Sequence, residues 1–386
     1  MLFAGILYAW SNIKAPFAEE LGYTRDALSL NFTLTMCFFC LGGFFAGKLV
    51  RRIGTRWTLI LAGVMAGVGF VLTSFLGASV PSLLYLTYAL LSGLGIGIAY
   101  ITVISTVNAW FPDRRGLSSG ALMMGFGAST LLLGNLAVSL FKGGLGWRGT
   151  YILIGGVIAF VVCLSSFIIK APSADTVFPE RKKNAASKKE SFEARDYTPA
   201  EMVRRFTFWR AFLGLVFLTA VGSTVISFAS DLARSVGAEA SLATTLVGVL
   251  AVCNGLGRII TGAVFDTLGR RFTMIGASIL TILAAGVTLI SVSVGSLALC
   301  VVGLCLTGLS YGTSPTVSSA FTSAFYGQKH FATNLSISNF NLMLASFFPT
   351  ICSKLLGVSG AYTVPFILLL SLSALSLALN VSIKRP

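Results

Sequence analysis

The chain has 386 residues, of which 55% are hydrophobic and only 11% are charged. A soluble protein carries roughly a quarter of charged residues, so this composition excludes an ordinary soluble domain. The net charge of +15 could suit nucleic acid, but the Lys and Arg residues fall mainly in alternate short loops, which is the pattern of a membrane protein and argues against a nucleic-acid partner.

The apolar residues gather into helix-length stretches. No Asp, Glu, Lys or Arg occurs from Trp57 to Pro112 or from Phe272 to Gln328, and each stretch can hold two helices of the roughly 20 apolar residues that cross a bilayer. The pattern therefore predicts an all-α membrane protein. We expect twelve transmembrane helices, near residues 1–18, 28–49, 57–77, 82–108, 116–140, 148–170, 207–230, 242–265, 273–294, 296–322, 331–355 and 361–383.

The first of these spans is short. It begins at Met1, and about 17 helical residues reach roughly 25 Å at 1.5 Å each, which is less than the roughly 30 Å of a hydrocarbon core. We expect this span to be incomplete at its cytoplasmic end, with a native product that begins upstream.

The basic residues give the spans an orientation. Cytoplasmic loops carry an excess of Lys and Arg, and the alternate loops of this chain hold few of them. We expect both termini on the cytoplasmic side of a plasma or inner membrane, together with the loops that follow the even-numbered spans. The residues that mark this side are Arg51, Arg52, Arg56, Arg114, Arg115, the lysine-rich segment 181–189, Arg270, Arg271, Lys329, Lys384 and Arg385.

A polar segment, 171–206, separates two apolar parts of the chain. We expect an N-terminal bundle of six helices over 1–170, a cytoplasmic linker over this segment and a C-terminal bundle of six helices over 207–386. Near the end of the linker, Thr198 and Glu201 have the spacing of a capping box. This spacing predicts a short surface helix that leads into the seventh span.

The two halves repeat one another. GKLVRRIGTRW at Gly47–Trp57 matches GAVFDTLGRRF at Gly262–Phe272 at a constant offset of 215 residues. We call these segments the first and second copies of the repeated loop. An internal duplication with six spans per half is typical of transporters in which two bundles move around a site near the middle of the membrane.

Three further motifs resemble those of a known family. They are NAWFPDRRGLSSG at Asn108–Gly120, NGLGRIITGAVFDTLGR at Asn254–Arg270 and FTFWRAF at Phe206–Phe212. With the repeated loop, they resemble the major facilitator superfamily over essentially the whole chain, and more narrowly its oxalate/formate antiporter family, a relative of the monocarboxylate transporters. The resemblance implies two six-helix bundles related by a pseudo-two-fold axis.

The resemblance also implies a function. It favours a secondary active transporter that moves a small organic anion, similar to a monocarboxylate, by alternating access, with no enzymatic reaction and no cofactor. The expected partners are this anion and membrane lipid, and we expect a monomer. A sensor derived from a transporter, or a proton-coupled carrier of another small solute, would leave a similar sequence, and both alternatives stay open.

Gating roles are carried over from the resemblance to charged residues in and near the repeated loop. The second copy keeps the acid of the family's signature, whereas the first copy departs from the pattern with Arg51. The residues to which the resemblance assigns gating are Arg52, Arg56, Asp113, Arg115, Asp266 and Arg270.

The main candidate for binding is Arg258, which lies near mid-membrane in the eighth span. A charge there costs roughly 2.5–3.5 kcal/mol on insertion scales, and arginine cannot avoid that cost by deprotonating. Its planar fork suits a carboxylate, and the resemblance places the family's anion-binding arginine here. The alternative is an arginine that stabilises the bundle through backbone carbonyls. Asn254 lies one turn earlier on the same face and can orient the arginine or the substrate.

Other candidate contacts come from three spans. Tyr8 and Lys14 belong to the first span, Tyr311 to the tenth, and Ser338 and Asn341 share one face of the eleventh. Each has a structural alternative, since aromatic residues pack membrane helices and polar side chains join them by hydrogen bonds. Lys14 either extends to the outer interface or supplies a second cation.

The sequence offers few residues for proton coupling, for a second substrate-binding cation or for a metal site. No Asp or Glu lies securely within a span, which favours exchange or uniport over acid-coupled symport. Leu342 stands where the oxalate antiporter pattern has a lysine, so the resemblance argues for a monocarboxylate rather than oxalate. The seven cysteines lie in apolar spans and the one histidine, His330, lies in a loop, so no metal site is expected.

Overall fold

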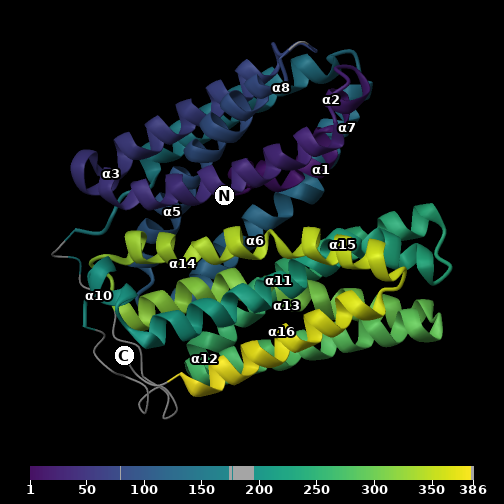
Figure 1. Ribbon diagram of the computed structural model, residues 1–386. Coiled ribbons are helices and arrows are strands. Elements are labelled where there is room, and N and C mark those ends of the chain that lie inside the picture. Colours follow the sequence, from purple (N-terminus) through teal and green to yellow (C-terminus); the bar gives the residue numbers. More distant parts are fainter. Residues whose placement is uncertain (79, 174–175, 177–194, 384–386) are drawn as a thin grey trace. The chain divides into compact units, whose positions relative to one another are not determined.

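The computed structural model describes residues 1–78, 80–173, 176 and 195–383. Every regular element in these residues is helical (Figure 1), as the hydropathy pattern predicts. Nine helices within them are long and apolar enough to cross a membrane. The expected basic segment 181–189 and the terminal Lys384 and Arg385 lie outside the described residues.

The helices follow one another with short connections. Two are π-helical, η2 and η3, and η1 is a 3-10 helix. In chain order they are η1 (Phe3–Ala9), α1 (Trp10–Ile13), α2 (Ala15–Glu19), α3 (Arg25–Thr73), α4 (Ser82–Leu84), η2 (Tyr85–Ser92), α5 (Gly93–Trp110), α6 (Arg115–Ser129), η3 (Thr130–Gly134), α7 (Asn135–Lys142), α8 (Gly146–Ile168), α10 (Pro199–Val203), α11 (Phe206–Ser235), α12 (Ala240–Val294), α13 (Leu297–Tyr326), α14 (Phe331–Ala345), α15 (Phe348–Ser359) and α16 (Thr363–Ser382).

The two longest helices, α3 and α12, each contain two of the expected spans. The backbone breaks at Gly54 (φ 77°, ψ 167°) in α3 and at Gly269 (φ 80°, ψ 177°) in α12. Side chains disfavour this left-handed region, which glycine reaches at no steric cost. The two glycines lie 215 residues apart, the offset of the repeated loop, so both copies turn the chain in the same way.

The expected first span is a series of short pieces rather than one helix. The 3-10 helix η1 passes into α1, and α2 begins with Pro16 in its first turn. The side chain of Trp10 donates from Nε1 to the carbonyl of Leu28 at 3.1 Å, which fastens this segment to α3. Its apolar residues Ile6, Leu7 and Ile13 are fully buried.

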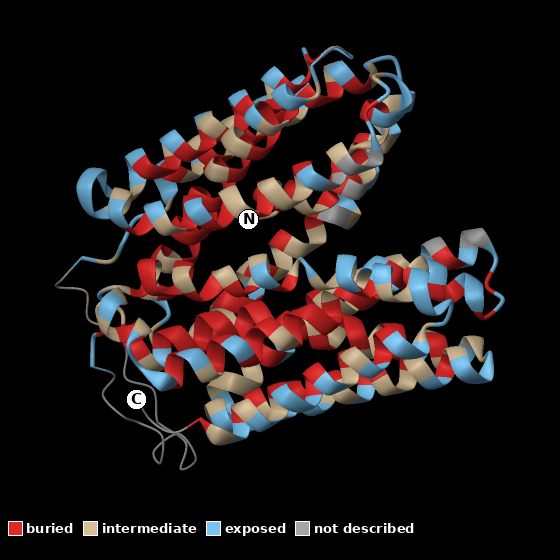
Figure 2. Cartoon of the chain, viewed as in Figure 1, coloured by how far each residue is buried: buried red, intermediate tan, exposed pale blue. Residues whose placement is uncertain are grey.

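The described chain forms two compact units. Unit 1 comprises 1–112, 125–179 and 330–337, and unit 2 comprises 113–124, 180–329 and 338–386. Within each unit the buried residues lie where helices face one another (Figure 2). The expected division into 1–170 and 207–386 stays a prediction.

Glycine faces bring helices close together inside unit 1. A Cβ added at Gly67 of α3 would lie 2.7 Å from the Cβ of Ala159 and 2.7 Å from the carbonyl oxygen of Gly155, both in α8. A Cβ at Gly63, one turn earlier, would lie 3.0 Å from Cβ of Val162. Such contacts of small residues hold membrane helices together through close backbone packing.

The end of the linker forms the predicted short helix, α10. Thr198 accepts from the backbone N–H of Glu201, and Glu201 accepts from the backbone N–H of Thr198, which completes the capping box. These hydrogen bonds from Thr198 lower the pKa of the Glu201 carboxyl. The capping box is therefore ionised and intact at neutral pH.

Candidate functional site

Arg258 is buried in α12, with 6% of its surface exposed. Its Nε donates to Oδ1 of Asn254 at 3.3 Å, and one Nη1 hydrogen bond goes to the backbone carbonyl of Met123 in α6. A guanidinium has five N–H donors, so these two bonds leave donors for a ligand. The bond to Met123 is the backbone-carbonyl contact named as the structural alternative for this arginine, and Asn254 orients the side chain. Binding of a carboxylate stays a prediction.

Small residues bring α6 close enough for this contact. Gly116 and Gly262 face each other so closely that neither has room for a Cβ, and Gly120 lies against the carbonyl of Arg258 in the same way. The hydroxyls of Ser119 and Ser319 are 2.7 Å apart and join α6 to α13. The motif GLSSG at the start of α6 is therefore a packing surface that places the Met123 carbonyl beside the guanidinium.

Tyr311 of α13 belongs to the same group. It lies close enough to Arg258 for the guanidinium to act on its hydroxyl electrostatically. Its ring packs on α11, where a Cβ at Gly222 would lie 2.6 Å from the ring. Gly312 sits directly against Asn254 and Arg258 of α12. Unit 2 therefore brings Arg258, Asn254 and Tyr311 together.

The polar face of α14 packs against α13. The hydroxyl of Ser338 lies 3.0 Å from that of Thr322. Asn341 is 1% exposed, and its Oδ1 has no hydrogen-bond partner among the described residues. A buried polar atom without a partner is rare in native structures, and it indicates a place for water or a polar ligand.

Two candidates lie in unit 1, so they are described apart from the group around Arg258. Tyr8 in η1 packs edge-on against Phe126, with ring centroids 5.4 Å apart. Lys14 is half-buried and joins α1 to α2. Their role in binding stays a prediction.

The second copy of the repeated loop places its acid at the start of α6. Asp266 accepts from the backbone N–H of Gly116 at 3.0 Å and from that of Leu117 at 2.8 Å. An anion is stabilised there because the first N–H groups of a helix lack partners within it. Arg115 donates to Oγ of Ser323 at 3.0 Å, and the carboxylate of Asp266 attracts its guanidinium.

The remaining gating candidates have different surroundings. Arg270 stacks over the ring of Phe325 at 4.8 Å, and Arg56 over that of Phe167 at 4.2 Å. Asp113 is 4.0 Å from Arg114 in an exposed pair, which contributes little to stability. Arg52 is exposed.

The first copy makes a contact that the sequence reasoning missed. Arg51 Nη1 lies 3.1 Å from Nδ1 of His330, both within unit 1. A signal was available in the repeat, because His330 follows Arg115 at the same offset of 215 residues. Arg51 and His330 therefore occupy the positions that Asp266 and Arg115 hold in the second copy.

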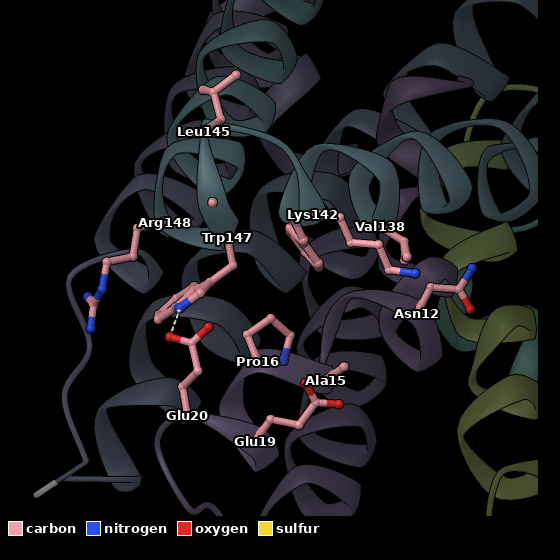
Figure 3. A pocket seen from close by; sticks show the side chains of 12 residues that line it. Asn12, Ala15, Pro16, Glu19, Glu20, Val138, Lys142, Leu145, Trp147 and Arg148 are labelled. Carbon is pink, nitrogen blue, oxygen red and sulfur yellow. Dashed lines mark hydrogen bonds between the residues drawn. The ribbon is translucent and has the colours of Figure 1, made fainter.

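A pocket of about 580 Å³ lies in unit 1 between α2, α7 and the start of α8 (Figure 3). Trp147 forms one wall, and its Nε1 donates to Oε2 of Glu20 at 2.6 Å. Arg148 stacks on the indole at 4.5 Å and donates to the carbonyls of Ser74 and Leu76. The predicted binding residues are not among those that line this pocket.

Most of the chain matches a known protein family. Residues 1–348 match the family model described as Major Facilitator Superfamily. The oxalate:formate antiporter of Oxalobacter formigenes is 28% identical over 342 residues, which are 86% of this chain and 77% of the relative. The uncharacterized MFS-type transporter YhjX of Escherichia coli (strain K12) is 26% identical over 344 residues, 86% of this chain and 80% of the relative. Monocarboxylate transporter 12 of Mus musculus is 31% identical over 185 residues, 47% of this chain and 37% of the relative.

Solved structures show the same fold at low sequence identity. The proton:xylose symporter XylE, bound to 6-bromo-6-deoxy-D-glucose, matches with a TM-score of 0.71 at 13% identity and covers 99% of this chain and 94% of its own. The fucose:proton symporter FucP of E. coli matches with a TM-score of 0.68 at 13% identity and covers 100% of this chain and 98% of its own. These likenesses concern the fold alone.

Proposed function

The chain belongs to the Major Facilitator Superfamily, and from that premise we propose that it carries a small organic anion, with the charge of a monocarboxylate, across a membrane. Membership makes it an integral membrane transporter and not an enzyme. The names of two relatives, an oxalate:formate antiporter and a monocarboxylate transporter, support an anion as the transported solute.

We further propose the twelve-span, two-bundle arrangement of 1–170 and 207–386. Nine described helices can cross a membrane. Counting α3 and α12 twice, because each is broken at a glycine, and adding the broken first span brings the number to twelve. We place the protein as a monomer in the plasma or inner membrane with both termini in the cytoplasm, on the strength of the basic loops.

The proposal that the substrate is an anion rests on Arg258. A permanent cation buried in an apolar helix is costly unless partners compensate its charge. Asn254 and the Met123 carbonyl are neutral partners, so the charge itself has no counter-ion among them. A substrate carboxylate would supply that counter-ion through the remaining N–H donors, in the bidentate geometry that guanidinium favours.

The neighbours of Arg258 extend the proposed site. Tyr311 lies within electrostatic reach of the guanidinium, and Asn341 keeps a buried acceptor without a partner. In the proposed site, Tyr311, Asn254, Ser338 and Asn341 contact the polar part of the substrate. Tyr8 and Lys14 are the proposed contributions of the first span.

Alternating access by exchange or uniport is the proposed mechanism. A carrier driven by protons through carboxylates needs an Asp or Glu within the spans, and the sequence places none securely there. In the proposed cycle an anion is bound to Arg258 whenever the binding site switches its exposure from one side of the membrane to the other. Without the anion, closing the site would leave the charge of Arg258 buried, away from water and unpaired, which is energetically costly. The residues proposed to act in gating are Arg52, Arg56, Asp113, Arg115, Asp266 and Arg270.

A binding measurement tests the substrate class directly. The melting temperature of the purified protein should rise with formate, acetate or another monocarboxylate that binds, since a ligand of the folded state stabilises it. The Arg258→Ala variant should fold and lose this rise, whereas neutral solutes of the same size should have no effect on either protein. A rise of equal size in Arg258→Ala would remove the site assignment.

A further inference from the structure

The single histidine of the chain is hydrogen-bonded to an arginine. Nη1 of Arg51 lies 3.1 Å from Nδ1 of His330. A guanidinium keeps its protons at every physiological pH and can only donate. Nδ1 of His330 must therefore accept, which requires a neutral imidazole that carries its proton on Nε2.

This contact ends a row of contacts between α3 and the start of α14. Oγ of Ser336 donates to the carbonyl of Gly43 at 2.6 Å, and Gly47 lies directly against Thr333. The segment 330–337 clusters with unit 1, whereas the rest of α14 clusters with unit 2. The contacts with α3 therefore account for the grouping of the first turns of α14 with unit 1.

In the second copy of the repeated loop, the equivalent contact with the start of a helix is made by different chemical groups. There Asp266 accepts from two backbone N–H groups at the start of α6. An ordinary carboxylate is ionised throughout the physiological range, whereas an imidazole changes charge within it. The first copy of the repeat therefore makes this contact with an imidazole, and the second copy makes it with a carboxylate.

We propose that His330 is a positioning residue that holds the start of α14 on α3 only while its imidazole is neutral, so that acidification around these loops releases the contact. Protonation would place an N–H of the imidazolium against an N–H of the guanidinium, and the two like charges repel. The contact should therefore be present while the imidazole is neutral and lost once it is protonated.

The charged neighbours reinforce this direction. Arg52 follows Arg51 on α3, Lys48 lies one turn before it, and Lys329 precedes His330 in the chain, so three more cations lie next to this pair in the sequence. The carboxylate of Asp196 is engaged elsewhere in this loop, because its Oδ1 accepts from the backbone N–H groups of Gln328 and Lys329 at 2.8 and 3.0 Å. A protonated His330 would thus add a positive charge to a stretch of chain that already carries several.

The first test is the melting temperature of the purified full-length protein at pH 7.5 and pH 5.5. His330→Gln keeps a neutral acceptor at both values, and Arg51→Gln removes the cation that would repel. On acidification the wild type should lose about 1–2 °C more than either variant, the size expected of one exposed polar contact. Lys354→Gln removes an exposed cation of α15, outside this contact, and is the matched control, which should behave as the wild type does. Equal losses in wild type, His330→Gln and Arg51→Gln would overturn the proposal.

A second readout concerns transport, and only this readout rests on the proposed function. In proteoliposomes, lowering the pH on the side of the basic loops should change the rate of wild-type anion exchange several-fold, and His330→Gln should flatten that profile. An unchanged profile in His330→Gln would contradict the role in the cycle. If no anion is transported at either pH while the melting temperatures differ as expected, the proposed function fails and the inference about His330 stands.

Discussion

At the scale of single residues, the proposed function depends on Arg258. Its guanidinium donates to the Met123 carbonyl and to Asn254, which orients it. Some of its N–H donors are therefore already bonded within the protein. The sequence could show the buried cation and its neighbour one turn away. It could not show Met123, because a backbone carbonyl from another helix leaves no pattern in side-chain types. The Arg51–His330 contact joins residues 279 positions apart, and the only signal for it in the sequence was the repeat offset that relates His330 to Arg115.

The first prediction concerns the two parallel hydrogen bonds that the guanidinium of Arg258 is proposed to donate to a carboxylate. Truncating a charged partner of a desolvated carboxylate costs about 2–5 kcal/mol, so Arg258→Ala should lower substrate affinity by at least about thirtyfold. Arg258→Lys should recover little of it, because an ammonium cannot reproduce two parallel hydrogen bonds. Equilibrium binding of labelled substrate to the purified proteins measures both effects. Full recovery in Arg258→Lys would show that charge alone is sufficient and that the bidentate geometry is wrong.

The second prediction concerns substrate charge. Leu342 of α14 is half-buried and lies next to Asn341, at the position where the resemblance expects a lysine. Leu342→Lys should shift preference from monocarboxylates toward dicarboxylates, because a second carboxylate would then find a cation. Competition of each class against a labelled monocarboxylate measures the shift, with Lys14→Ala as the comparison. Strong oxalate binding by the wild type that survives Lys14→Ala would refute the account with one substrate-binding cation.

At the scale of elements, glycines determine how closely the helices around the site approach. The sequence indicated the repeated loop, and in the structure Gly54 and Gly269 turn its two copies in the same way. The capping box at Thr198 was equally visible, since its geometry is local. The broken first span and the π-helices η2 and η3 were not, because helix type within an apolar run depends on packing against neighbouring helices.

The third prediction tests the packing of α6 on α12. Gly262→Ala introduces a methyl group where Gly116 leaves no room, and overpacking of this kind typically costs about 1–3 kcal/mol. Gly276→Ala in the same helix is the matched control, because nothing lies within 4 Å of its added Cβ. Thermal melts should show a lower melting temperature for Gly262→Ala and an unchanged or higher one for Gly276→Ala. Equal melting temperatures in the two variants would mean that the close contact of α6 with α12 does not form.

At the scale of the whole molecule, hydropathy and the repeat predicted a helical membrane protein with two similar halves. The resemblance of the loop motifs indicated the superfamily, and the family match confirms it. The number of spans was harder to obtain from helices alone, since a glycine turn joins two spans into one long element. Orientation rests on the basic loops, which are a statistical property of membrane proteins and not a contact in the fold.

The fourth prediction tests that orientation. Single cysteines introduced at Arg51 and Arg270 in a cysteine-free background should react with a membrane-impermeant maleimide only after the cells are permeabilised. A cysteine at Gly144, in the exposed connection between α7 and α8, should react in intact cells. Reaction of the Arg51 and Arg270 positions from outside intact cells would reverse the proposed topology.

The central claim is that this superfamily member carries a small organic anion, by exchange or uniport, through a site built around Arg258. Counterflow in proteoliposomes measures it directly, with unlabelled monocarboxylate inside and the labelled compound outside. Wild-type vesicles should accumulate label transiently above the equilibrium level, and Arg258→Ala vesicles with the same amount of inserted protein should show only the slow entry of empty liposomes. Accumulation by Arg258→Ala at the wild-type rate would contradict the claim.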